Sequence, residues 1–137
     1  MNPPDSSNSA TWLPKQRIGS YELMRELARG GMGEIWLARQ SGPRGFDRLV
    51  VLKRIIAGDE DSSFESMFID EARISVQLNH ANVVHIHELG KHDDAYYIAM
   101  EYVSGKDLRA LLERFRRRRE IMPTAMAVFV ASKMCEG

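Results

Sequence analysis

The chain has 137 residues with 19 basic and 19 acidic side chains, a length that fits one domain with its own core. The zero net charge argues against a globally basic nucleic-acid-binding protein, and the single cysteine, Cys135, excludes an intrachain disulfide. No stretch approaches the ~18 consecutive apolar residues of a membrane helix. The first residues also lack the basic and apolar pattern of a signal peptide, so we expect a cytoplasmic protein.

The N-terminal segment 1–17 is rich in Pro, Ser and Asn and shows no periodicity. This composition predicts a disordered leader. Trp12 and Leu13 leave an alternative open, in which these two side chains dock on a partner or on the back of the domain. The folded part is expected to begin at residue 18.

Five strands are expected in the middle of the chain. The first three form an antiparallel meander, because the turn-rich segments 28–33 and 41–45 separate them. The last two flank a turn at 91–94. The five expected strands are 21–27, 34–39, 49–56, 83–89 and 95–102.

A helix is expected from Ser62, since Ser62 and Glu65 form a capping-box pattern. The apolar residues of this helix recur near a period of 3.6. They are Phe64, Met67, Phe68, Ile74 and Leu78.

Two more helices are expected towards the C-terminus. The first has an amphipathic stripe of Leu108, Leu111, Leu112 and Phe115. The second, opened by Pro123, is apolar nearly all round over 125–134 and is expected to be buried on most sides. The order of elements predicts an α+β fold with helices beside an antiparallel sheet.

Glycines stand between the first two expected strands, at Gly30, Gly31 and Gly33. In a dinucleotide-binding fold such a loop runs from a strand into a helix, whereas here residues 35–37 continue as a strand. The loop is therefore interpreted as the tip of a hairpin. By itself it is explained as a tight turn that uses the freedom of glycine at positive φ.

Lys53 shares a face with Val51 on an otherwise almost wholly apolar strand, where an unpaired amine costs free energy. Glu71 falls on the apolar stripe of the first helix. We therefore expect Lys53 and Glu71 to pair. In the alternative, Lys53 extends to solvent and Glu71 pairs with Arg73 or Arg25.

Five segments in this order resemble the small lobe of a bacterial serine/threonine protein kinase, over about residues 20–137. Leu27–Ile35 is similar to the glycine-rich loop, Val50–Lys53 to the V-A-I-K strand, and Glu71 to the acidic residue of the C-helix. His80–Val84 resembles H-P-N-I-V, and Met100–Gly105 resembles the hinge between lobes. The resemblance implies a five-stranded antiparallel sheet with a C-helix and hinge over 18–103, and the start of the large lobe over 104–137.

The resemblance also implies an ATP site, with Mg²⁺ in the complete enzyme. Lys53 would contact the α- and β-phosphates and form the supporting ion pair with Glu71, while the hairpin backbone would cover the phosphates. The nucleotide-binding residues implied in this way are Leu27, Ala28, Arg29, Gly30, Gly31, Met32, Gly33, Ile35, Val51, Lys53, Met100, Glu101, Val103 and Asp107.

Individual roles follow from the same resemblance. Leu27, Ile35 and Val51 would sandwich the adenine, and Met100 would be the gatekeeper at the back of the pocket. Backbone groups of Glu101 and Val103 would bind the adenine edge. Asp107 matches the position that often contacts the ribose.

This sequence departs from the family pattern at three positions. Ala28 replaces the first glycine of the loop, Val51 replaces the usual alanine, and Ala81 replaces the proline of H-P-N-I-V. The H-R-D-x-x-x-x-N, D-F-G and A-P-E motifs are absent from the 137 residues, and with them the catalytic base and the magnesium ligands. We therefore expect a kinase fragment that is inactive alone, although the complete enzyme would transfer the ATP γ-phosphate to protein Ser or Thr.

Other functions stay open at this point. A non-catalytic kinase lobe would dock on a partner protein, or on a second copy, through the apolar last helix. In a third alternative, Arg116–Arg119 would contact nucleic acid. A solvated helix end explains these arginines better, so no nucleic-acid partner is expected. His85 and His87 would hold a metal only with a third ligand, and none is evident.

Overall fold

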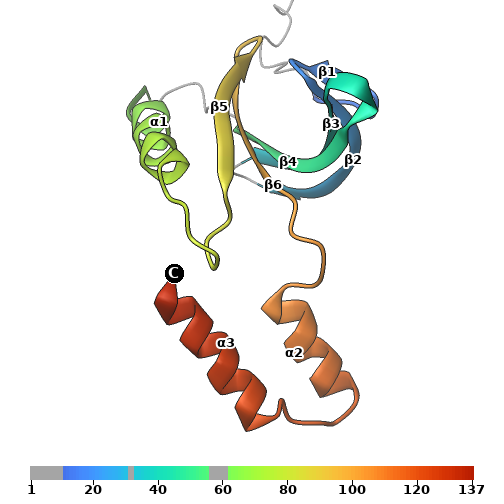
Figure 1. Cartoon of the computed structure of the whole chain (residues 1–137), viewed down its shortest axis with the longest axis vertical. Helices are drawn as coiled ribbons and strands as arrows, with labels where there is room; N and C mark the ends of the chain where they lie inside the picture. Colours follow the sequence, from blue (N-terminus) through green and yellow to red (C-terminus); the bar gives the residue numbers. More distant parts are fainter. Residues whose placement is uncertain (1–10, 31–32, 56–61) are drawn as a thin grey trace, which may run out of the picture. The chain divides into compact units, whose positions relative to one another are not determined.

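The computed structural model describes residues 11–30, 33–55 and 62–137, without the side chains of residues 62–65, 68 and 71 (Figure 1). The chain forms two compact units. One comprises Met1–Leu78 and His85–Tyr102, and the other comprises Asn79–Val84 and Val103–Gly137. The chain therefore passes twice from the first unit to the second.

The first unit contains a curled antiparallel sheet of six strands in the order β1-β2-β3-β4-β6-β5 (Figure 1). The strands are β1 (Arg17–Ile18), β2 (Tyr21–Gly30), β3 (Gly33–Ser41), β4 (Asp47–Ile55), β5 (Ile86–His92) and β6 (Ala95–Glu101). The five expected strands and the antiparallel meander are confirmed. The short strand β1 is an addition that the sequence did not predict.

Local chemistry explains where the strands turn and bend. β2 carries irregularities between Leu23 and Arg25 and between Glu26 and Ala28, and these account for its imperfect alternation of apolar and polar residues. Asp93 lies in the turn between β5 and β6 and has a φ of 51°, a left-handed conformation that Asp tolerates better than most residues.

One face of the sheet carries the buried core of the first unit. The core side chains are Trp12, Ile18, Tyr21, Leu23, Trp36, Ala38, Val50, Leu52, Tyr97 and Ala99. We call this the outer face. Aromatic rings meet edge to face in it, with centroids 6.2 Å apart for Trp12 and Tyr97 and 6.3 Å apart for Tyr21 and Tyr97.

Residues 11–17 are ordered, unlike the leader expected over 1–17. Trp12 is only 3% exposed, because its ring completes the outer-face core. The Lys15 N–H donates to the Leu23 carbonyl at 2.7 Å, and the Leu23 N–H donates to the Gln16 carbonyl at 2.9 Å. Of the two alternatives for Trp12, docking on the back of the domain is therefore correct. The rest of the expected leader, residues 1–10, lies outside the described residues.

Helix α1 (Ser62–Val76) lies beside β5 (Figure 1). Ala72 is buried at 2% exposure, whereas Met67 and Ile74 are 60% and 66% exposed. The predicted apolar stripe is therefore wrong for Met67 and Ile74, and also for Leu78, which lies beyond the helix end and is exposed. Apolar periodicity misled here because a small residue, Ala72, occupies a buried position of the helix.

The second unit contains α2 (Leu108–Arg117) and α3 (Thr124–Glu136). Both helices were expected, but α3 has no buried residue, contrary to its predicted burial. The short segment Asn79–Val84 joins this unit, and the Asn82 side-chain amide donates to Glu136 at 3.3 Å. None of the helices among the described residues is long and apolar enough to cross a membrane.

Candidate functional site

The candidate site begins with Lys53 on β4 and the side chains that share its face of the sheet. The pairing register sets Lys53 opposite Ile35 on β3 and Ile98 on β6. Val51 is likewise opposite Leu37 and Met100. Because side chains alternate between faces along a strand, these residues all lie on the inner face, opposite the buried core.

This inner face combines one cation with apolar neighbours. Lys53, Ile35, Val51 and Met100 are partly exposed, whereas Leu37 and Ile98 on the same face are buried. Part of this face is therefore accessible. An apolar surface suits a flat heterocycle, and an amine beside it suits phosphate. The apolar side chains therefore suit the adenine of ATP, and the Lys53 amine suits its phosphates.

The expected partner of Lys53 is Glu71. Among the described side chains Lys53 has no ion-pair partner, and the Glu71 side chain lies outside them. The pair therefore stays a prediction. The exposed positions of Met67 and Ile74 also weaken the periodicity argument that had placed Glu71 on a buried stripe.

The glycine hairpin closes with Gly30 opposite Gly33. Gly33 has a φ of 135°, and a Cβ there would collide with the carbonyl oxygen of Arg54. Glycine at this position is therefore required by the backbone of β4. A Cβ on Gly30 would meet no other atom within 4 Å. The expected site residues Gly31 and Met32 lie outside the described residues.

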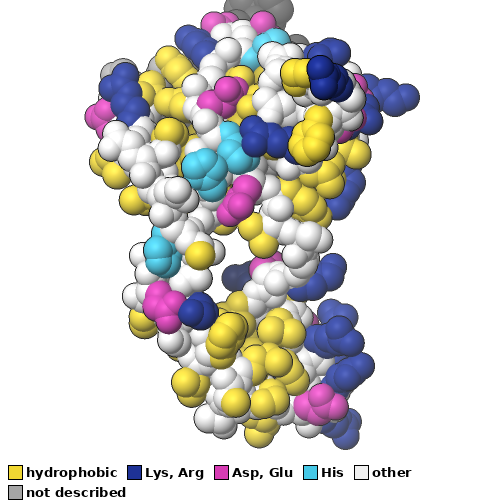
Figure 2. All heavy atoms as spheres, viewed as in Figure 1, with side chains coloured by type: hydrophobic (Ala, Val, Ile, Leu, Met, Phe, Trp, Pro, Cys, Tyr) yellow, Lys and Arg dark blue, Asp and Glu magenta, His cyan; other side chains and the backbone are white. Residues whose placement is uncertain are grey.

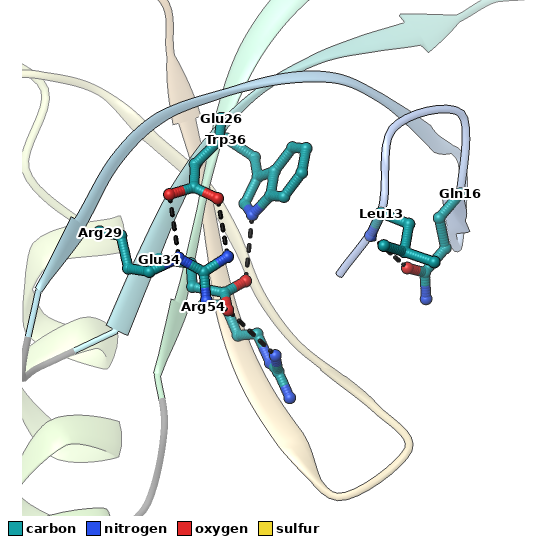
Figure 3. Close-up of polar contacts among 7 residues, drawn as sticks. All are labelled: Leu13, Gln16, Glu26, Arg29, Glu34, Trp36 and Arg54. Carbon is teal, nitrogen blue, oxygen red and sulfur yellow. Dashed lines mark hydrogen bonds and ion pairs between the residues drawn. The ribbon is translucent and has the colours of Figure 1, made fainter. Parts of the chain in front are cut away.

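Arg29, which was expected near the phosphates, directs its side chain to the outer face instead (Figure 3). Its Nε and Nη2 donate to the two carboxylate oxygens of Glu26, at 3.0 and 2.7 Å. Its Nη1 donates to Oε1 of Glu34 at 2.6 Å. The hydrogen bonds and charge of Arg29 lower the pKa of Glu26 from its ordinary value, because both favour the ionised carboxylate.

Glu34 is a functional candidate that the sequence did not single out. It is 1% exposed, accepts a hydrogen bond from Trp36 Nε1 at 3.1 Å, and lies 3.6 Å from Nη1 of Arg54 (Figure 3). The guanidinium of Arg54 in turn lies 5.5 Å from the ring of Trp12. The available signal was that Glu34 and Arg54 are charged residues beside apolar runs of β3 and β4. Which of these charged residues contact each other could be known only from the pairing register of β3 and β4.

Two further residues of the hairpin, Leu27 and Ala28, were expected in the nucleotide site, Leu27 beside the adenine. Ala28 is opposite Ile35 in the register and therefore shares the inner face. Leu27 falls within the irregularity of β2 and is 36% exposed. The structure thus brings Ala28, Ile35, Val51, Lys53 and Met100 to one face.

The segment that resembles the hinge is divided between the two units. The Glu101 N–H donates to the His85 carbonyl at 2.9 Å, so this amide is already engaged within the sheet. Val103 and Asp107 belong to the second unit. Asp107 caps α2, because its carboxylate accepts the Ala110 N–H at 2.6 Å.

His85 and His87 form a pair of half-buried rings with centroids 5.1 Å apart. Burial, helped by the charge of Arg48, lowers the pKa of His87 and keeps its ring neutral near pH 7. In the part of the chain that the structure describes, no three His, Cys, Asp or Glu side chains gather as a metal site.

Comparison with known proteins places the chain among the kinases. The protein kinase domain family matches residues 21–137. The tyrosine-protein kinase MasK of Myxococcus xanthus (strain DK1622) is 39% identical over 142 residues, which cover 100% of this chain and 22% of MasK. The serine/threonine-protein kinase PrkC of Bacillus subtilis (strain 168) is 39% identical over 99 residues, which cover 71% of this chain and 15% of PrkC.

A third relative is the serine/threonine-protein kinase PknJ of Mycobacterium tuberculosis (strain ATCC 25618 / H37Rv). It is 33% identical over 120 residues, which cover 88% of this chain and 19% of PknJ. The chain thus spans between 15% and 22% of the length of these three relatives. Since the kinase domain match extends over most of the chain, the chain belongs to the protein kinase family.

Proposed function

We propose that this chain is the ATP-binding part of a bacterial serine/threonine protein kinase. The observation that supports this most is the common face of Lys53, Ile35, Val51 and Met100 in a chain of the kinase family. The three apolar side chains would hold the adenine. Lys53 would hold the α- and β-phosphates and, by the family resemblance, pair with Glu71. Bound ATP, with Mg²⁺, supplies the γ-phosphoryl group that a complete kinase transfers.

The proposed acceptor in the complete enzyme is a protein Ser or Thr hydroxyl. PrkC and PknJ are named serine/threonine-protein kinases, which supports this choice, whereas MasK is named a tyrosine-protein kinase. The 137 residues contain no H-R-D-x-x-x-x-N or D-F-G motif. We therefore expect this chain alone to bind ATP in the cytoplasm without transferring phosphate.

Calorimetric titration of the 137-residue chain with ATP tests the proposal. Lys53→Met removes a charge-assisted contact to phosphate and is expected to weaken ATP binding roughly 10- to 100-fold. Lys91→Met is the matched control, because Lys91 lies on β5 of the same sheet with its Nζ 5.0 Å from the Tyr96 ring. Circular dichroism must verify that both variants fold. Unchanged ATP affinity in folded Lys53→Met would refute the site.

A second candidate function is docking on a partner protein or a second copy. The exposed apolar side chains of α3 favour it, with Val128, Phe129 and Met134 at 62%, 61% and 70% exposure. Figure 2 shows hydrophobic side chains gathered over α2 and α3, bordered by basic side chains. Light scattering with and without ATP tests this function. A dimer that Phe129→Asp converts to monomer would support it, and a monomer at all concentrations would exclude self-association.

A further inference from the structure

Arg29 lies beside the glycine hairpin, where a free guanidinium would be expected to reach for phosphate. Most of its donors are already occupied, since three of the five N–H groups of a guanidinium bind Glu26 and Glu34 at 2.6 to 3.0 Å. The contact with Glu26 is bidentate, which is the strongest geometry for this pair of groups. The Arg29 side chain therefore binds other residues of the fold rather than a ligand.

The charges around Arg29 are balanced. Glu26 and Glu34 carry two negative charges, and Arg29 and Arg54 carry two positive charges. A cation in a neutral network attracts phosphate weakly, because its field is cancelled at short range. This network also lies on the outer face, on the opposite side of the sheet from Lys53.

The position of the network along the strands is specific. Arg29 directly precedes Gly30, Glu34 directly follows Gly33, and the two charged residues are paired in the strand register. Their side-chain contact therefore joins β2 to β3 at the step next to the closing pair of Gly30 and Gly33. Gly30 and Gly33, whose backbone would face the phosphates in the proposed site, are held from both sides.

The network is also anchored in the core. Glu34 is buried and receives the Trp36 indole N–H at 3.1 Å, and Arg54 behind it is only 3% exposed. The hairpin end is thus tied through Glu34 to the sheet (Figure 3). Glycines next to a turn would otherwise sample many conformations, and ordering them on binding costs free energy.

We propose that Arg29 is a positioning residue for ATP, which clamps the glycine hairpin to the outer face through Glu26 and Glu34 so that its backbone is preorganised for the phosphates. This role rests on the proposed ATP site. Lys53 and the apolar inner face would contact the nucleotide, whereas Arg29 would act from the other side of the sheet. The clamp is therefore expected to affect phosphate recognition and to leave adenine recognition unchanged.

The test compares ATP with adenosine in titrations of the 137-residue chain. Arg29→Ala is expected to weaken ATP binding about 3- to 10-fold and to leave adenosine binding unchanged, since only preorganisation is lost. Glu26→Gln removes the surface half of the clamp, spares the buried Glu34, and is expected to have the same effect. The double variant should be no weaker than either single variant. Arg48→Ala is the control, because it removes the same charge from the outer face, where Arg48 pairs with Gln40 and contacts neither Glu26 nor Glu34.

Each of the following outcomes would refute the positioning role of Arg29. If Glu26→Gln strengthens ATP binding, Arg29 is itself a phosphate ligand that Glu26 holds back, and if it leaves ATP affinity unchanged, Glu26 has no part in a clamp. If ATP and adenosine weaken equally, the clamp supports the fold in general. If Arg29→Ala binds ATP as tightly as the unchanged chain, there is no positioning effect. If the unchanged chain binds no ATP, the proposed function fails, and the positioning role fails with it.

Discussion

Glu34 and Arg54 face each other across β3 and β4, and Nη1 of Arg54 lies 3.6 Å from Oε1 of Glu34 with both side chains buried. Among the described residues, Nε of Arg54 has no hydrogen-bond partner. The guanidinium therefore depends on Glu34 and on the Trp12 ring to offset its lost hydration. This pair connects the hairpin end to the N-terminal segment of the fold.

Replacing Glu34 should destabilise the first unit strongly. Glu34→Ala leaves Arg54 as a buried, uncompensated charge, and we expect a loss of about 3–5 kcal/mol in the free energy of unfolding. Urea denaturation followed by tryptophan fluorescence measures it. The control is Glu22→Ala, which breaks the partly exposed pair with Arg39 at 3.1 Å and should cost less than about 1 kcal/mol. Equal losses in the two variants would contradict the importance of burial.

The two hairpin glycines should respond differently to the same substitution. Gly33→Ala forces a side chain against the Arg54 carbonyl at a positive φ, so we expect a loss of more than about 1 kcal/mol in the free energy of unfolding. Gly30→Ala meets no atom within 4 Å and should keep the fold. Thermal melts compare the stability of the two variants.

The same Gly30→Ala variant serves as a functional test. If the hairpin covers the phosphates, a methyl group at Gly30 should weaken ATP binding although the melting temperature is unchanged. Titration of the folded variant with ATP measures the effect. An ATP affinity equal to that of the unchanged chain would place the phosphates away from Gly30.

Trp12 should contribute as a core residue although it precedes the first strand. Trp12→Ala removes a ring that packs on Tyr97 and Arg54, and we expect a loss of about 3–5 kcal/mol. Leu13→Ala is the neighbouring control, since Leu13 is 62% exposed and should change stability by less than about 0.5 kcal/mol. Denaturation midpoints that do not distinguish the two variants would show that Trp12 is not part of the core in solution.

Alkaline solution should loosen the outer face. Burial and the Glu88 carboxylate raise the pKa of Tyr21 and of Tyr97 from 10.0 to about 12. Because the folded pKa lies above the unfolded value, the stability from these protonated hydroxyls is complete below about pH 10. It is lost as the pH rises towards about 12.

Thermal melts between about pH 8 and about pH 12 check this titration. Tyr97→Phe removes the hydroxyl that donates to Glu88 at 3.2 Å, so it should cost about 1 kcal/mol at neutral pH. The variant should also show a smaller fall in melting temperature above about pH 10. An identical fall in the variant would assign the alkaline transition to other groups.

The fold of the first unit was largely predictable from the sequence. Alternating apolar residues and glycine-rich or proline-rich turns predicted the five strands of the meander and of the last hairpin, because strand and turn preferences are local. The family motifs likewise stood in order along the chain. The lobe boundary expected between residues 103 and 104 and the Lys53–Glu71 pair stay predictions.

The face of α1 was predicted less well. The exposed Met67 and Ile74 and the buried Ala72 show that apolar size alone did not determine which side of the helix packs on β5. A small side chain lets the helix backbone approach the sheet closely. The side of α1 that faces the sheet therefore depends on packing rather than on apolar size. The sequence carries no local signal for that choice.

The sequence by itself determined the strand order along the chain, the glycine hairpin and the position of Lys53 among apolar residues. Only the tertiary structure determined that Arg29 turns to Glu26 and Glu34, that Arg54 pairs with Glu34, and that Trp12 closes the core. The physical reason is strand register. A shift of one residue would exchange the two faces of a strand, so contacts between residues distant in sequence follow from packing of the whole sheet.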